Sequence, residues 1–189
     1  MRREHWCRVV MNRAVEAYVN KLDHPRLAAL EISGRAWAHL PFKLHFPTGY
    51  PNYDVCKSAL VYEDKGQKPF DIIFIEQVLE HVQSPAAAVR NIYNSLAEGG
   101  HLVLSTPFLL KIHDAPGDYW RWTEAGLRLL LQEAGFAAQD IETGSWGNRD
   151  CLMANLDDWA WYDPEQHSLR NEPELPLVVW AFARKFKRA

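Results

Sequence analysis

One stretch of this chain, residues 70–107, constrains the fold more than any other because it reads as strand, helix and strand. It contains Ile72 to Ile75, a short apolar run rich in β-branched residues, which is typical of a strand buried on both faces. A second apolar run of the same kind covers residues 101–104. A strand, a helix and a parallel strand form a right-handed crossover unit. The sequence therefore predicts an α/β protein.

The helix expected between these strands has recognisable ends. Ser84 offers a side-chain oxygen as N-cap, and Pro85 suits the first helical position because no backbone N–H is needed there. Gly99-Gly100 is predicted to end the helix, since glycine adopts the left-handed conformation at little cost. Ligands of such sheets bind beyond the carboxyl ends of the strands, so residues 76–81 form the first candidate site.

The rest of the chain continues the α/β pattern. A lead helix is expected over residues 3–22, and another helix is expected to begin after the N-cap Thr123 and to end at Gly135. Further strands are expected at Leu27 to Ile32, Ala138 to Thr143 and Leu177 to Phe182. Prolines and a glycine in residues 35–53 disfavour a long helix there.

Length and composition favour a single cytoplasmic domain. A chain of 189 residues with 48% hydrophobic residues can bury one core, and a net charge of −3 argues against a nucleic-acid partner. No apolar run approaches the ~18 residues of a membrane span. The three cysteines are scattered, as in reduced proteins. We divide residues 1–189 into a lead helix (1–26), a core (27–145), and an aromatic-rich lid segment with the last strand (146–189).

Two motifs carry a resemblance to a known family. The run FDIIFIEQVLEHV, followed by a helix and EGGHLVLSTPF, resembles the second half of class I S-adenosylmethionine-dependent methyltransferases. Residues 113–136, HDAPGDYWRWTEAGLRLLLQEAGF, resemble a signature of a branch of small methyltransferases. The resemblance implies a Rossmann-like, doubly wound sheet of seven strands with the last strand antiparallel. It also implies S-adenosylmethionine as cofactor and a small acceptor such as a sugar or secondary metabolite.

The resemblance places part of the cofactor site just after the first strand. Glu31 matches the family's acidic position and Gly34 matches a glycine of its turn, while Ser33 and Arg35 stand where further glycines are expected. Arg35 is then a candidate partner for the methionine carboxylate of the cofactor. The alternative is that Glu31 merely ends a strand and that Arg35 is a surface residue. The first crossover helix is expected to be truncated.

The adenine side of the cofactor is expected near the next segments. Asp54 and Val55 resemble the adenine loop, and residues Glu76, Gln77 and Val78 follow the FD strand. A turn aspartate is the alternative reading of Asp54. The acid that binds the ribose hydroxyls in the family has no clear counterpart, because the expected strand end carries His45-Phe46-Pro47.

Three residues are candidates for the chemistry. His81 and His113 are candidate bases because histidine is the residue type suited to proton transfer near neutral pH, and Asp114 follows His113 as a carboxylate that could orient it as a base. The alternative for each histidine is a structural role, in which its side chain holds a loop in place. A Glu-x-x-Glu-His pattern binds metal in ubiquinone-pathway methyltransferases, but Gln77 replaces its first glutamate here, so no metal is expected.

Aromatic and charged residues suggest an acceptor pocket. Aromatic faces suit sugar rings or planar acceptors, and a guanidinium suits an anionic group. The candidates are Tyr119, Trp120, Arg121 and Trp122, followed by Trp146, Asn148 and Arg149. Core packing is the alternative for the first group. The aromatic segment 152–176 is typical of either a substrate lid or a homodimer surface.

Two functions follow from these residues. The first is S-adenosylmethionine-dependent methyl transfer to a small-molecule acceptor. The second is a non-catalytic binding module or partner subunit with the same fold that has lost cofactor affinity. The glycine-poor turn favours the second function, whereas the 113–122 cluster favours the first.

Overall fold

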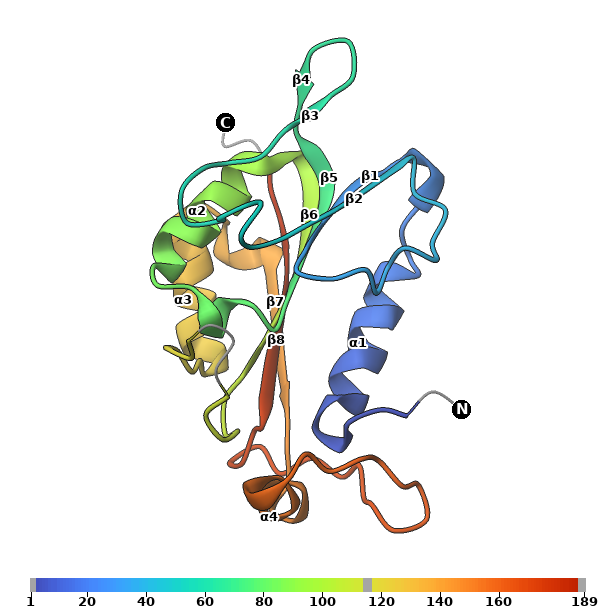
Figure 1. The fold of residues 1–189 in the computed structure, drawn as a ribbon, viewed down its shortest axis with the longest axis vertical. Helices are drawn as coiled ribbons and strands as arrows, with labels where there is room; N and C mark the ends of the chain where they lie inside the picture. Colours follow the sequence, from blue (N-terminus) through green and yellow to red (C-terminus); the bar gives the residue numbers. More distant parts are fainter. Residues whose placement is uncertain (1–2, 114–116, 187–189) are drawn as a thin grey trace.

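The computed structural model describes residues 3–113 and 117–186, and a six-stranded sheet forms its centre (Figure 1). The strands lie in the order β2-β1-β5-β6-β8-β7. β2, β1, β5 and β6 run parallel, while β8 is antiparallel to both of its neighbours. Their bounds are β1 Ala28–Ile32, β2 Leu44–Thr48, β5 Phe70–Glu76, β6 Leu96–Pro107, β7 Ile141–Trp146 and β8 Val178–Arg184. The predicted α/β class and the antiparallel last strand are confirmed.

Helices cover both faces of this sheet (Figure 1). α1 lies on one face, and α2 and α3 lie on the other. Ile73 and Ile75 of β5 pack with the α2 and α3 side, while Ile72 and Phe74 pack with the α1 side, so this strand is buried on both faces as predicted. The helices are α1 Val9–Val19, α2 Pro85–Ser95, α3 Glu124–Ala134 and α4 Arg149–Asp157, with 3₁₀ turns η1 Trp6–Arg8, η2 His24–Arg26, η3 Leu79–His81 and η4 Ala138–Asp140.

The main sheet has six strands where seven were expected. Residues 62–68 do not join it, because β3 Tyr62–Glu63 pairs with β4 Gln67–Lys68 in a separate two-stranded hairpin. The connection between β1 and β2, residues 33–43, consists of turns without a helix. Residues 33–43 join two parallel strands, but a crossover that includes a helix usually needs a dozen or more residues, so this shorter connection has no room for a helix. The first crossover helix, which was expected to be truncated, is therefore absent between β1 and β2.

Two helix ends differ from the prediction and one agrees. Ser84 stands at the N-cap of α2, but its side chain makes no capping hydrogen bond. α2 already ends at Ser95, because the buried Leu96 takes an extended backbone and pairs with Phe70. Gly99, with φ of 79°, therefore shapes β6 instead of capping the helix. Thr123 caps α3 as predicted, since its side chain accepts a hydrogen bond from the backbone N–H of Gly126.

Among the described residues, no helix has both the length and the apolar character needed to cross a membrane.

Candidate functional site

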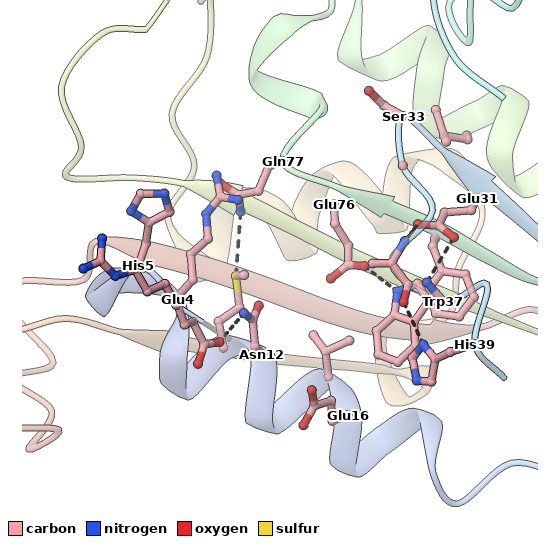
Figure 2. A pocket seen from close by; sticks show the side chains of 18 residues that line it. Glu4, His5, Asn12, Glu16, Glu31, Ser33, Trp37, His39, Glu76 and Gln77 are labelled. Carbon is pink, nitrogen blue, oxygen red and sulfur yellow. Dashed lines mark hydrogen bonds between the residues drawn. The ribbon is translucent and has the colours of Figure 1, made fainter. Parts of the chain in front are cut away.

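A cavity of about 480 Å³ lies between α1 and the carboxyl ends of β1 and β5 (Figure 2). This is the edge of the sheet where ligands of open α/β proteins bind. Side chains from α1 and its preceding segment form one wall, and the turn after β1 forms another. The labelled lining residues in Figure 2 are Glu4, His5, Asn12, Glu16, Glu31, Ser33, Trp37, His39, Glu76 and Gln77.

Two residues that line this cavity have left-handed backbone conformations, which non-glycine residues rarely adopt. Ser33 has φ of 68° and Gln77 has φ of 55°, and each directly follows a parallel strand. Left-handed conformations of non-glycine residues cost free energy and persist where the surrounding structure holds them. Backbone hydrogen bonds hold both, from Ser33 N to Thr48 O (2.6 Å) and from Gln77 N to Ser105 O (2.8 Å). Strain at the ends of two adjacent strands indicates that this cavity is a candidate ligand site.

Glu31 holds the turn that walls the cavity. Its buried carboxylate accepts hydrogen bonds from the backbone N–H groups of Ala36 and Trp37 and contacts His45 Nε2 at 2.7 Å. Gly34 lies close to this carboxylate, since a Cβ there would lie 2.8 Å from Glu31 Oε1 and would force that side chain to shift. Glu31 therefore supports the turn in this structure.

Glu76 and Trp37 form the floor of the cavity. Trp37 Nε1 donates a hydrogen bond to Glu76 Oε2 at 2.7 Å, and the indole stacks on Phe74 with ring centroids 4.9 Å apart. Burial raises the pKa of the Glu76 carboxyl, and the neighbouring Glu31 raises this pKa further, while the Trp37 bond opposes the shift. A carboxylate in this position is stabilised by a cationic ligand.

Gln77 presents an unused acceptor at the same cavity. Its side-chain nitrogen lies 3.3 Å from Ser105 Oγ and 3.7 Å from Met11 Sδ. Its Oε1 is buried and has no hydrogen-bond partner in the described part of the chain. A buried acceptor without a partner is costly, so a ligand that donates an N–H or O–H group here would remove that cost.

The other predicted cofactor residues do not line this cavity. Arg35 is exposed. Asp54 Oδ1 accepts a hydrogen bond from the backbone N–H of Cys56 at 3.0 Å, as a turn aspartate does. Val55 is 4% exposed and belongs to the hydrophobic core, against which Val78 also packs. The structure therefore brings Glu31, Ser33, Gly34, Glu76 and Gln77 together and leaves the others apart.

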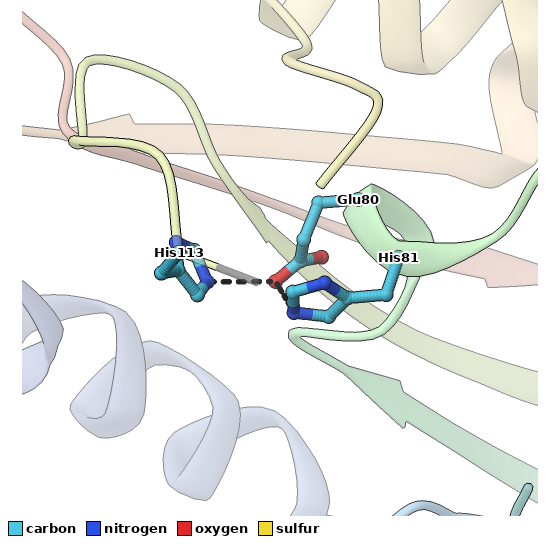
Figure 3. Close-up of side chains that lie close together, drawn as sticks. All are labelled: Glu80, His81 and His113. Carbon is cyan, nitrogen blue, oxygen red and sulfur yellow. Dashed lines mark ion pairs between the residues drawn. The ribbon is translucent and has the colours of Figure 1, made fainter. Parts of the chain in front are cut away.

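A second cluster of functional side chains follows β5 (Figure 3). Glu80 and His81 of η3 meet His113, which lies beyond β6. Glu80 Oε1 lies 3.6 Å from His81 Nε2 and 4.0 Å from His113 Nε2. The Glu80 side chain is fully buried, and this burial raises its pKa. Both histidines proposed as bases thus lie at one site, while Asp114 lies outside the described residues.

An aromatic side chain links the two sites. The Trp159 ring lies edge-on to His113 with ring centroids 5.5 Å apart, and edge-on to His5 at 5.8 Å. His5 in turn stacks on Trp161 at 4.1 Å and lines the cavity. Part of the aromatic segment predicted to be a lid or a dimer surface therefore packs beside both sites.

The motif at residues 118–122 contains two residues that hold the loop together by polar contacts and others whose aromatic rings are exposed. Asp118 and Arg121 form a partly buried ion pair, and Arg121 also donates to the carbonyl of Lys111. Arg121 is therefore already paired within its loop. Tyr119 is exposed, and Trp120 and Trp122 stack at 5.8 Å beside a second cavity of about 500 Å³.

The Asp118 pair predicts a dependence of stability on pH. The hydrogen bond from Arg121, with help from the His113 backbone, lowers the pKa of Asp118 to about 2. An aspartate with a depressed pKa stabilises the fold above its unfolded pKa of about 3.9 and loses this contribution as the pH falls through about 2. We expect Asp118→Asn to cost about 2 kcal/mol of unfolding free energy at pH 7.

Urea unfolding of the variant and the unmodified protein, repeated from about pH 7 to about pH 2.5, measures this difference. The difference should shrink below about pH 4. Asp157→Asn, at an exposed side chain, is the control and should change little. A penalty for Asp118→Asn that stays constant over this range would contradict the assignment.

The residues predicted after β7 have structural roles in the described conformation. Trp146 is 1% exposed, and its indole donates to the carbonyl of Leu169. Asn148 is buried at the N-cap of α4, where its oxygen accepts from Cys151 N and its nitrogen donates to Ser168 O. Arg149 is exposed. Their positions give no support to the expectation that they contact an acceptor.

The fold and the cavity together define a class of protein. A mostly parallel sheet with an antiparallel β8 between β6 and β7, and a ligand cavity beyond β1 and β5, is the Rossmann-like architecture of class I methyltransferases. A family model described as a methyltransferase domain matches residues 22–141. The chain therefore belongs to this methyltransferase domain family. A search of curated protein sequences gave no significant match.

Solved structures share the fold at low sequence identity. An S-adenosylmethionine-dependent methyltransferase from Mesorhizobium loti has a TM-score of 0.58 at 17% identity, over 95% of this chain and 98% of that one. Phosphoethanolamine N-methyltransferase 2 from Haemonchus contortus, in complex with S-adenosyl-L-methionine, has a TM-score of 0.56 at 11% identity. The match covers 93% of this chain and 53% of that one. A structure from Haloferax volcanii, a complex of the Trm112 methyltransferase activator and a putative methyltransferase, has a TM-score of 0.57 at 12% identity. The match covers 97% of this chain and 96% of that one.

Proposed function

We propose that this chain binds S-adenosylmethionine at the cavity beside α1 and transfers its methyl group to a small-molecule acceptor. The single observation that carries the proposal is the convergence of Glu76, the unpartnered Gln77 oxygen and two strained strand ends on one cavity of about 480 Å³. This volume is in the range of small-molecule sites. Membership of the methyltransferase domain family and the neighbour bound to the cofactor support the choice of ligand.

The residues present fit the amino-acid end of this cofactor. The glutamates of the lining suit its ammonium and sulfonium charges, and Gln77 Oε1 can accept an N–H from the ammonium group. The cofactor supplies a methyl group on a positively charged sulfur. Glu76 and Gln77 would hold the charged end, while Glu31 keeps the turn in place. Arg35 and Asp54 remain proposed contacts for the carboxylate and the adenine, although they do not line the cavity.

The acceptor is proposed to enter beside η3. His81 and His113 lie there with Nε2 atoms that could take a proton from an acceptor hydroxyl. Tyr119 and Trp120 offer exposed aromatic faces nearby in the chain, which suit a sugar or another ring. Because methyl transfer is an in-line displacement, the main task of these residues is to position the acceptor.

A non-catalytic role is the competing function, and two observations favour it. Glu31 is already satisfied by protein groups, and Trp37 fills part of the space above Phe74. A structural neighbour occurs in a complex with a methyltransferase activator, which agrees with a chain that needs a partner. Cofactor binding to the isolated protein separates the two functions.

Calorimetric titration with S-adenosylmethionine and S-adenosylhomocysteine tests the proposal. We expect binding of both ligands, and we expect Glu76→Gln to weaken S-adenosylmethionine at least tenfold, which is about 1.4 kcal/mol, because the variant keeps an acceptor for Trp37 but removes the negative charge. Glu165→Gln, at an exposed glutamate, is the matched control. Asp54→Ala tests the adenine contact, which should be worth over about 1 kcal/mol if it is a buried charged hydrogen bond.

Two outcomes would change the conclusion. Absence of binding at millimolar ligand by a protein shown to be folded would overturn the proposal and favour the binding module. Binding that is equal in the Glu76→Gln variant and the unmodified protein would remove the cavity from the cofactor site. Unchanged affinity in Asp54→Ala would remove only Asp54.

A further inference from the structure

We propose that Glu80, His81 and His113 form a binding site for a divalent transition-metal ion, with Zn²⁺ as the best match. One ligand atom from each residue lies within 4.8 Å of the other two (Figure 3). No metal was expected from the sequence, because Gln77 replaces the first glutamate of the Glu-x-x-Glu-His pattern. The third ligand, His113, lies 32 positions after His81 and beyond β6, so only the folded chain brings it to the other two. The proposal concerns metal binding alone and does not depend on the cofactor.

The hydrogen bonds of both histidines leave the Nε2 atoms free to bind a metal. His81 Nδ1 lies 2.7 Å from the carbonyl oxygen of Gly117, and His113 Nδ1 lies 3.2 Å from that of Lys111. A carbonyl oxygen only accepts, so each Nδ1 carries the proton and each Nε2 keeps its lone pair. Metal-binding histidines almost always donate their other N–H to a carbonyl or carboxylate in this way.

The carboxylate of Glu80 needs a positive partner. Its side chain is fully buried, and Oε1 has no hydrogen-bond partner in the described part of the chain. Both Nε2 atoms face this oxygen, so the cluster places three acceptors around one point. A buried carboxylate without a charged partner is expensive, and binding of a proton or a cation removes that cost.

The distances favour a metal ion over a proton. Glu80 Oε1 lies 3.6 Å from His81 Nε2 and 4.0 Å from His113 Nε2, and both separations exceed the reach of a hydrogen bond. An ion about 2.0–2.2 Å from each ligand separates the ligand atoms by roughly 3.0–3.6 Å. A small inward movement of the three side chains would therefore complete the site.

The donor set selects the kind of metal. Two imidazole nitrogens and one carboxylate oxygen suit Zn²⁺ and Co²⁺, while Mg²⁺ and Ca²⁺ prefer oxygen ligands. Three protein ligands leave the fourth position of Zn²⁺ open for water or another ligand, as in catalytic zinc sites. Thr106 Oγ1 lies 3.5 Å from Glu80 Oε2 and can orient the carboxylate.

Titration of the tag-free, chelator-treated full chain with Zn²⁺ and Co²⁺ tests the proposal. We expect one ion per chain by calorimetry, a visible absorption band for Co²⁺ that Zn²⁺ abolishes, and no comparable binding of Mg²⁺. Glu80→Gln and His113→Ala should each weaken Zn²⁺ at least tenfold. His24→Ala is the control, because His24 lies at the amino end of β1, away from the cluster, and contacts the carbonyl of Val19.

Circular dichroism of each variant shows whether it is folded, and Zn²⁺ should raise the melting temperature of the unmodified protein but not that of Glu80→Gln. Failure of the folded, unmodified protein to bind either ion would overturn the site. Binding that both variants retain unchanged would overturn it as well, since the ion would then be held elsewhere. These readouts need no S-adenosylmethionine, so they remain valid whatever the outcome of the cofactor titration.

Discussion

Gly147→Ala is expected to destabilise the protein by about 3 kcal/mol or more. Gly147 lies between β7 and α4 and packs against the segment that leads into β8. A Cβ at this position would lie 2.0 Å from the carbonyl oxygen of Leu175 and 2.5 Å from the backbone nitrogen of Leu177. Both obstacles are backbone atoms, so no change of rotamer can relieve the clash.

Thermal and urea unfolding of the variant measure this effect, and a fall in melting temperature of roughly 6–12 °C is expected for a chain of this size. Gly126→Ala in α3 is the matched control, because its nearest neighbour is Thr123 Oγ1 at 3.3 Å and alanine favours a helix. A loss of less than about 1 kcal/mol for Gly147→Ala would contradict the described packing.

Glu31→Ala is expected to cost about 3–5 kcal/mol and to abolish detectable binding at the cavity beside α1. The buried carboxylate accepts from the backbone N–H groups of Ala36 and Trp37 and pairs with His45. Removing it leaves these donors without their partner and releases the turn that carries Ser33 and Trp37. Stability and ligand affinity should therefore fall together.

The measurement combines urea unfolding with calorimetric titration of S-adenosylhomocysteine. Glu63→Ala, at an exposed glutamate of the β3–β4 hairpin, is the control and should stay within about 0.5 kcal/mol of the unmodified protein. A stable Glu31→Ala variant with full affinity would show that the turn does not depend on this carboxylate. A variant that loses stability but keeps affinity would separate the turn from the ligand site.

Much of the fold was predictable because its signals are local. The apolar runs of β5 and β6 identified buried parallel strands, and Thr123 and Gly135 marked both ends of α3. The sequence misplaced the end of α2, since the burial of Leu96 against β5 outweighs the turn preference of the glycine pair. The family resemblance also implied seven strands in the main sheet, whereas the sheet has six and residues 62–68 form a separate hairpin, because strand pairing depends on contacts distant in the chain.

The candidate sites were predictable only in part. The family resemblance identified Glu31 and Gly34, and position at the carboxyl end of a parallel strand identified Glu76 and Gln77. All four line the cavity. The same reasoning grouped Trp146 and Asn148 with the acceptor, although segment 168–171 covers both and takes up their polar atoms. Residue type alone does not distinguish an indole that binds a ligand from one that packs in the core.

The sequence by itself determined the α/β class, the crossover unit at residues 70–107 and the edge of the sheet where polar residues collect, because periodicity and turn chemistry act over a few residues. Only the tertiary structure decided that Ser33 and Gln77 take left-handed backbones and that Glu80 meets His81 and His113. Each of these arrangements joins segments that are distant in the chain. Their geometry is set by how loops pack on the finished sheet, and that packing has no signature in any short stretch of residues.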